Sequence, residues 1–174
     1  MTTLYITHPS FVDHDTGPGH PERPDRIRAI DKVLSHESFE PLKREEAPKG
    51  TDEMIARVHP QEYIDAIREA APESGLVHID GDTLMSPGTM EAVLHGVGAT
   101  VRATDAVMSG EVQNAFCGVR PPGHHAEPER AMGFCLFNNI AIAAMHARAK
   151  HGAERVAVRS EEHTSELQSQ NRIS

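Results

Sequence analysis

Apolar residues recur along the chain at two spacings, which predict short strands and amphipathic helices. Leu4-Tyr5-Ile6 is a compact apolar run that ends before His8-Pro9 and predicts a first strand. Residues 11–24 contain several Asp, Gly and Pro residues and predict a loop. Pro24 is favoured in the first turn of a helix, and the residues after it predict a helix whose apolar face carries Ile27, Ile30, Val33 and Leu34.

Short elements are predicted for the next part of the chain. Residues 39–47 predict a short strand. Thr51 or Asp52 is suited to cap a helical stretch, and further amphipathic turns follow Pro60. Residues 75–87 are again rich in Gly, Asp and Pro, and they predict a second loop.

The longest predicted helix runs from residue 87 to about residue 109. Ser86 is suited to be its N-cap and Pro87 its first residue. Gly96 and Gly98 lie within this helix, where each costs about 1 kcal/mol relative to Ala. Two such residues at this spacing predict a neighbouring segment that packs closely against the helix.

The rest of the chain alternates between strands and helices. Residues 115–119 predict a buried strand. Asn138 or Asn139 then begins a helix that is apolar almost all round, is therefore expected at the centre of the fold, and ends at Gly152. Residues 155–158 predict another strand. This alternation is typical of an α/β domain with a mainly parallel sheet, in which active sites lie beyond the C-terminal ends of the strands.

The composition excludes several classes of protein. The 174 residues carry a formal net charge of −9, so we expect no direct binding of nucleic acid. An acidic surface suits cationic ligands such as lysine-rich tails or polyamines, or it serves solubility alone. The two cysteines, Cys117 and Cys135, are too few for a zinc ribbon, and no apolar run approaches the roughly 18 residues of a membrane span. We expect a cytoplasmic protein that does not bind membranes.

His124 and His125 are the leading candidates for catalysis. They follow Pro121-Pro122-Gly123, a bend that allows two adjacent side chains to approach the same centre. Imidazole both accepts and donates protons near neutral pH, as general acid–base catalysis requires. A pair of surface or capping histidines is the alternative. Zinc coordination by the pair is disfavoured, because no further ligands lie nearby at useful spacing.

Three blocks of sequence carry a resemblance to a known family. They are residues 19–26 (Gly-His-Pro-Glu-Arg-Pro-Asp-Arg), residues 82–91 and residues 120–139. Residues 1–158 resemble the histone deacetylase superfamily, especially its class II-like and bacterial branch, which includes acetylpolyamine amidohydrolases. The resemblance implies a three-layer arginase/deacetylase-like α/β fold. It also implies zinc-dependent hydrolysis of acetyl-lysine or of a related acylated amine such as a polyamine.

The resemblance also implies roles for individual residues. His125 would be the general base and then the general acid, and His124 would be its electrostatic partner. The residues implied in contacts with substrate and product are Gly133 and Phe134 at the wall of an acyl-lysine tunnel, Asp82 at its rim, and Arg26 at the cavity through which acetate leaves. A structural salt bridge is the alternative for Arg26.

The family's zinc ligands are expected in an Asp-x-His motif directly after residues 156–158 and at a later Asp. Residues 159–174 are instead polar and resemble translated adapter DNA, with a disordered native tail as the alternative. We therefore expect residues 1–158 to be the N-terminal part of a deacetylase-like domain that supplies no zinc ligands. Zinc would belong to the complete protein, and this chain would be an inactive fragment.

Two other functions are alternatives to this interpretation. A non-catalytic protein that binds acyl-lysine or another protein is the alternative from a different class. An arginase-like site with two manganese ions is disfavoured, because the Asp ligands it needs do not occur near His124 and His125. The sequence makes no prediction about oligomeric state.

Overall fold

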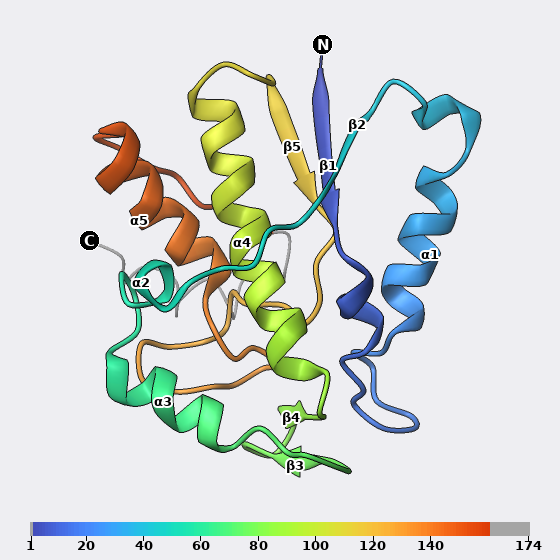
Figure 1. The fold of residues 1–174 in the computed structure, drawn as a ribbon, viewed down its shortest axis with the longest axis vertical. Helices are drawn as coiled ribbons and strands as arrows, with labels where there is room; N and C mark the ends of the chain where they lie inside the picture. Colours follow the sequence, from blue (N-terminus) through green and yellow to red (C-terminus); the bar gives the residue numbers. More distant parts are fainter. Residues whose placement is uncertain (1, 161–174) are drawn as a thin grey trace.

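Three parallel strands form the central sheet of the computed structural model, which describes residues 2–160 (Figure 1). Strand β1 (Thr3–Thr7) lies in the middle, between β2 (Lys43–Glu46) and β5 (Asn114–Cys117). Both neighbours run parallel to β1. The sheet therefore confirms the mainly parallel α/β architecture expected from the sequence.

Helices cover both faces of the sheet and complete three layers. They are α1 (Asp25–Leu34), α2 (Asp52–Ile55), α3 (Gln61–Glu69), α4 (Thr89–Met108), α5 (Asn139–His151) and the 3-10 helices η1 (Pro9–Val12) and η2 (Glu37–Phe39). Figure 1 shows α1 on one side of the sheet and α4 and α5 on the other. Because side chains alternate along a strand, Tyr5 hydrogen-bonds to Asp31 of α1, whereas Leu4 and Ile6 pack with alanines of α4.

Helix α4 contributes to two apolar cores, which explains why it is apolar on more than one face. The first core joins the sheet, α1 and α4, and includes Leu4, Ile6, Phe11, Ile27, Ala99 and Ala103. The second joins α2, α3, α4 and α5, and includes Ile55, Ile64, Val97, Val101, Leu136 and Ile142. In the part of the chain that the structure describes, no helix is long and apolar enough to cross a membrane.

Only one of the two glycines within α4 has a close neighbour. A Cβ atom on Gly98 would lie 1.8 Å from the carbonyl oxygen of Pro48, in the segment that follows β2. A Cβ atom on Gly96 would have its nearest neighbour at 3.8 Å, which is an ordinary contact. The predicted close approach is therefore confirmed at Gly98 and wrong at Gly96.

The loop predicted for residues 75–87 contains a small antiparallel hairpin, β3 (Val77–His78) and β4 (Leu84–Met85). Two-residue strands are too short to produce an alternating pattern, so the sequence does not reveal them. The N-cap prediction is also wrong, since α4 begins at Thr89 after Gly88. The hydroxyl of Ser86 instead accepts a hydrogen bond from the backbone N–H of Asp15.

The predictions for the two later strands need correction. Strand β5 is only partly buried, and Phe116 is 46% exposed. Residues 155–158 form no strand, and Val156 and Val158 are exposed. A strand needs a hydrogen-bonded neighbour, and no segment of residues 2–160 pairs with these residues. Most of the tail predicted for residues 159–174 lies outside the described residues.

Candidate active site

The loop that carries His124 and His125 begins just after the C-terminal end of β5, as predicted for an active site in a parallel sheet. The two imidazole rings lie beside each other, with centroids 4.1 Å apart and planes inclined by 51°. Both residues are partly buried. The bend at Pro121-Pro122-Gly123 thus brings both rings to one place, as the sequence indicated.

Asn138 fastens this loop to helix α5. Its side-chain amide donates to the carbonyl oxygens of Ala126 and His124, at 2.9 and 3.4 Å. Its side-chain oxygen accepts a hydrogen bond from the backbone N–H of Ala141 and so caps α5, which confirms one of the two predicted caps. The position of the histidines is therefore coupled to the start of a buried helix.

His59 is hydrogen-bonded to two residues of the same loop, Pro128 and Asn138. The sequence pattern did not identify it as part of the site. Its Nε2 accepts a hydrogen bond from the backbone N–H of Asn138 at 2.9 Å, and its Nδ1 lies 2.9 Å from the carbonyl oxygen of Pro128. These partners require a neutral ring with its proton on Nδ1. Burial lowers the pKa of His59 by more than the hydrogen bond to Pro128 raises it. The side chain is therefore a neutral brace.

Gly133 and Phe134 form a sharp turn against His125. Both have positive φ angles, +58° and +69°. A Cβ atom on Gly133 would lie 2.7 Å from Cδ2 of His125, so only glycine fits there without displacing the ring. The backbone N–H of Phe134 donates to the hydroxyl of Thr83 at 3.1 Å. The predicted tunnel residues therefore adjoin the predicted base, whereas their contact with substrate stays a prediction.

Asp82 lies at an exposed turn between β3 and β4. It is next to Thr83, whose hydroxyl accepts the hydrogen bond from the backbone of Phe134. Its carboxylate accepts a hydrogen bond from the hydroxyl of Thr83, and its carbonyl oxygen accepts one from Nε2 of His20. The His20 ring also meets the ring of Phe134 edge-on, with centroids 4.9 Å apart. These contacts join three loops into one rim, and Asp82 keeps its carboxylate at the surface.

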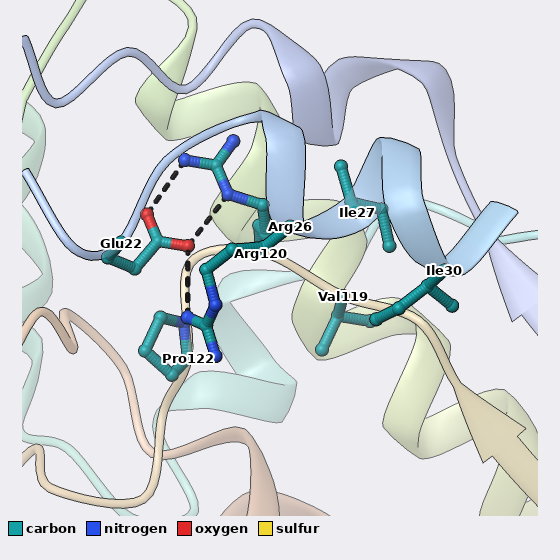
Figure 2. A pocket seen from close by; sticks show the side chains of 7 residues that line it. All are labelled: Glu22, Arg26, Ile27, Ile30, Val119, Arg120 and Pro122. Carbon is teal, nitrogen blue, oxygen red and sulfur yellow. Dashed lines mark hydrogen bonds and ion pairs between the residues drawn. The ribbon is translucent and has the colours of Figure 1, made fainter. Parts of the chain in front are cut away.

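A buried ion pair links Glu22 to Arg120, the residue just before the bend that leads to the two histidines (Figure 2). Arg120 donates from Nε and NH2 to the two carboxylate oxygens of Glu22, each at 2.7 Å, across 98 residues of sequence. Nε2 of His14 lies 3.4 Å from the same carboxylate. Burial acts to raise the pKa of Glu22, but the nearby His14 ring and the hydrogen bonds from Arg120 outweigh it and lower the pKa to about 2. Sequence reasoning did not anticipate this pair.

Arg26 lies beside the ion pair, where its NH1 is 3.7 Å from Glu22 (Figure 2). Together these groups border a cavity of about 100 Å³, lined by Glu22, Arg26, Ile27, Ile30, Val119, Arg120 and Pro122. Pockets for drug-sized ligands measure roughly 300–1,000 Å³, so this cavity suits only a molecule of a few atoms. Arg26 therefore forms a salt bridge and borders a small cavity, whereas its role in the release of acetate stays a prediction.

The loop that carries His124 and His125 does not have the ligand set that zinc needs. Within residues 2–160, one group of three His, Cys, Asp or Glu side chains brings its ligand atoms within 4.8 Å of one another: Asp105, His146 and His151. Neither His124 nor His125 belongs to this group. Within residues 2–160, His124 and His125 are therefore not joined by the further ligands that a zinc site requires.

Comparisons with known proteins agree with the three blocks of sequence. The family model described as "Histone deacetylase domain" matches residues 20–158. The crystal structure of the HDA15 HD domain superposes with a TM-score of 0.79 at 31% identity, over 86% of this chain and 44% of that one.

Several curated proteins are similar over most of this chain. A histone deacetylase-like amidohydrolase of Pseudomonas aeruginosa is 39% identical over 149 residues, which are 85% of this chain and 39% of that protein. A probable deacetylase of Archaeoglobus fulgidus is 35% identical, over 91% of this chain and 44% of its own length. The human polyamine deacetylase HDAC10 is 37% identical, over 79% and 21%. The chain thus spans less than half the length of these relatives.

Proposed function

Because the chain belongs to the histone deacetylase family, we propose that it carries the proton-transfer half of a zinc-dependent deacetylase site. The observation that supports this proposal most directly is the packing of His125 against Gly133, beside His124 and the turn of Phe134. A proton-transfer group needs a fixed ring position, and this contact restricts the ring.

His125 would accept a proton from the attacking water and then deliver it to the leaving amine. His124 would be its electrostatic partner, since the centroid of its ring lies 4.1 Å from that of His125. Acid–base assistance of this kind contributes roughly 10²–10⁴ in rate.

The substrate we propose is an acylated amine, either acetyl-lysine or an acetylated polyamine. Phe134 would line the path of the aliphatic chain, and the exposed carboxylate of Asp82 would hold polar groups at the rim. The net charge of −9 favours cationic substrates of both kinds. Released acetate would pass the small cavity beside Arg26, whose guanidinium attracts a carboxylate.

The zinc ligands of this proposed site would come from residues outside the described part of a longer chain. On this proposal, the 174-residue chain does not hydrolyse a fluorogenic acetyl-lysine substrate or an acetylated polyamine, even with added zinc. Turnover that needs zinc and disappears in His125→Ala would refute the proposed division of the site. Binding of acetyl-lysine peptide without turnover would favour the non-catalytic alternative.

A chimera tests the proposed role of His125 in a positive assay. Residues 1–158 would replace the matching segment of the Pseudomonas aeruginosa relative, which aligns with 85% of this chain. In a chimera that folds and is active, His125→Ala should lower kcat/KM by about 10²–10⁴. His36→Ala, at an exposed site in η2's N-cap, is the matched control and should leave activity unchanged. Equal activity of the His125→Ala chimera would exclude the role.

Two further expectations belong to this proposal. Residues 159–174 would be absent from the native protein, and the protein would be cytoplasmic. Sequencing an independent clone across codon 159 tests the first. We expect the codons after Val158 in that clone to encode a sequence that differs from residues 159–174. Fractionation of cells that express the native gene tests the second, with the protein expected in the soluble cytoplasmic fraction.

A further inference from the structure

A second cluster of titratable side chains lies between α4 and α5. Oδ1 of Asp105, on α4, lies 2.6 Å from Nε2 of His146 and 2.6 Å from Nε2 of His151, both on α5. The two histidines come about two and about three turns after the first residue of α5, the end that adjoins the catalytic loop. The cluster is therefore distinct from the site of His124 and His125.

The three side chains differ in their access to solvent. His146 is buried, His151 is partly buried, and the side chain of Asp105 is 41% exposed. The two histidine rings meet edge-on, with centroids 5.7 Å apart. His146 is thus held in place by packing, while the open side at Asp105 lets a small solute reach the cluster.

We propose that Asp105, His146 and His151 form a binding site for zinc or another first-row divalent transition ion. Two imidazole nitrogens and one carboxylate oxygen are the ligand types that such ions bind, and here all three atoms lie within 4.8 Å of one another. Zinc with three protein ligands retains a fourth position for water, and the exposed side of Asp105 provides room for it.

The hydrogen bonds show what an ion must replace. Asp105 only accepts hydrogen bonds as a carboxylate, so each Nε2 that faces it carries a proton. Bonds of 2.0–2.1 Å in tetrahedral geometry separate two ligand atoms by roughly 3.3 Å. The contacts of 2.6 Å must therefore widen by several tenths of an ångström, and the protons must move to Nδ1.

Arg57, just after α2, opposes this proton shift at His146. Its NH1 donates to Nδ1 of His146 at 2.6 Å, so Nδ1 cannot carry a proton while Arg57 stays there. A metal-bound histidine normally donates its other N–H to an acceptor. Arg57 has an alternative partner in Glu53, at 3.5 Å, which it can keep when it leaves the ring. Arg57 therefore competes with the ion.

Replacement of Arg57 distinguishes a metal site from a purely structural cluster. In Arg57→Gln the side-chain carbonyl can accept the Nδ1 proton of His146, and the positive charge is gone. Outer partners of metal-bound histidines change metal affinity by about 10–100-fold, so we expect at least tenfold tighter binding in this variant. In a cluster held only by hydrogen bonds, the loss of Arg57 would not create metal affinity.

The experiment is a titration of the untagged 174-residue chain with Co²⁺, followed by competition with Zn²⁺. Visible d–d absorption reports tetrahedral coordination of Co²⁺, and we expect one such ion per chain. His151→Ala should weaken binding at least tenfold, and because His151 is the last residue of α5 the helix should persist in circular dichroism. His36→Ala, at an exposed histidine, controls for adventitious surface binding and should not change the titration.

The proposal is overturned if His151→Ala and Asp105→Asn bind Co²⁺ as the unmodified chain does. It is also overturned if His36→Ala weakens binding as much as His151→Ala, or if no visible absorption develops in either the unmodified chain or Arg57→Gln. Loss of binding in His151→Ala, together with tighter binding in Arg57→Gln, supports it.

Discussion

The Cα atom of Gly133 packs against the imidazole of His125, and a Cβ atom there would lie 2.7 Å from Cδ2 of the ring. Gly133 also has a φ of +58°, which L side chains rarely adopt. The two constraints act together, because the turn that requires positive φ also presses the backbone onto the ring. Glycine is therefore needed for the position of His125 as well as for the turn.

We predict that Gly133→Ala lowers the free energy of unfolding by about 2–5 kcal/mol, since left-handed strain of about 1–2 kcal/mol adds to overpacking of about 1–3 kcal/mol. Gly110→Ala is the matched control, because Gly110 has a φ of +77° and open space around it. It should show the strain alone. Urea unfolding measures both, and equal losses in the two variants would contradict a rigid contact at His125.

The buried pair of Glu22 and Arg120 predicts a large effect of neutralising the carboxylate. Glu22→Gln leaves the guanidinium of Arg120 buried without its counter-charge, which should lower the free energy of unfolding by about 3–5 kcal/mol. Asp25→Asn removes an exposed partner of Arg28 and should cost no more than about 0.5 kcal/mol. Thermal and urea unfolding would measure both variants, and a small effect of Glu22→Gln would show that the pair contributes little.

His59 predicts a loss of stability as the pH falls. Burial lowers its pKa in the folded protein, so the unfolded chain, with a histidine pKa near 6.5, takes up the proton first. Stability should be complete above about pH 7 and fall below pH 6.5, by at most about 1.4 kcal/mol per pH unit for this one proton. His59→Gln should have a shallower pH dependence in urea unfolding, and parallel curves for the two proteins would contradict the assignment.

The two glycines of α4 predict opposite effects of the same substitution. In Gly96→Ala the new methyl group has no neighbour closer than 3.8 Å, so helix propensity should raise the free energy of unfolding by about 0.5–1 kcal/mol. In Gly98→Ala the methyl group would meet the carbonyl oxygen of Pro48, and we expect a loss of about 1–3 kcal/mol or more. Thermal unfolding of the two variants measures the effect of the contact between residue 98 and Pro48, since the chemical change is the same in both. Equal changes in melting temperature in the two variants would contradict the contact.

Local patterns in the sequence predicted the elements that depend on nearby residues. Leu4-Tyr5-Ile6 lies in β1, the apolar spacing after Pro24 marks α1, and Asn138 and Gly152 bound α5 as capping chemistry requires. These signals are reliable because strand alternation, helix periodicity and caps involve residues only a few positions apart. The motif around His124 and His125 likewise indicated the family, which the match over residues 20–158 shows.

Contacts between distant segments were decided only in the folded molecule. The pairing of Glu22 with Arg120 joins residues 98 positions apart, and the hydrogen bond from Asn138 to His59 depends on how the turn between α2 and α3 meets the loop before α5. Residues 155–158 have a strand-like pattern but no strand, because hydrogen bonds to a neighbour are needed and no partner occurs within residues 2–160. The periodicity of the sequence indicates which residues are buried, whereas tertiary packing determines which side chains contact one another. The chemistry of this site depends on those contacts.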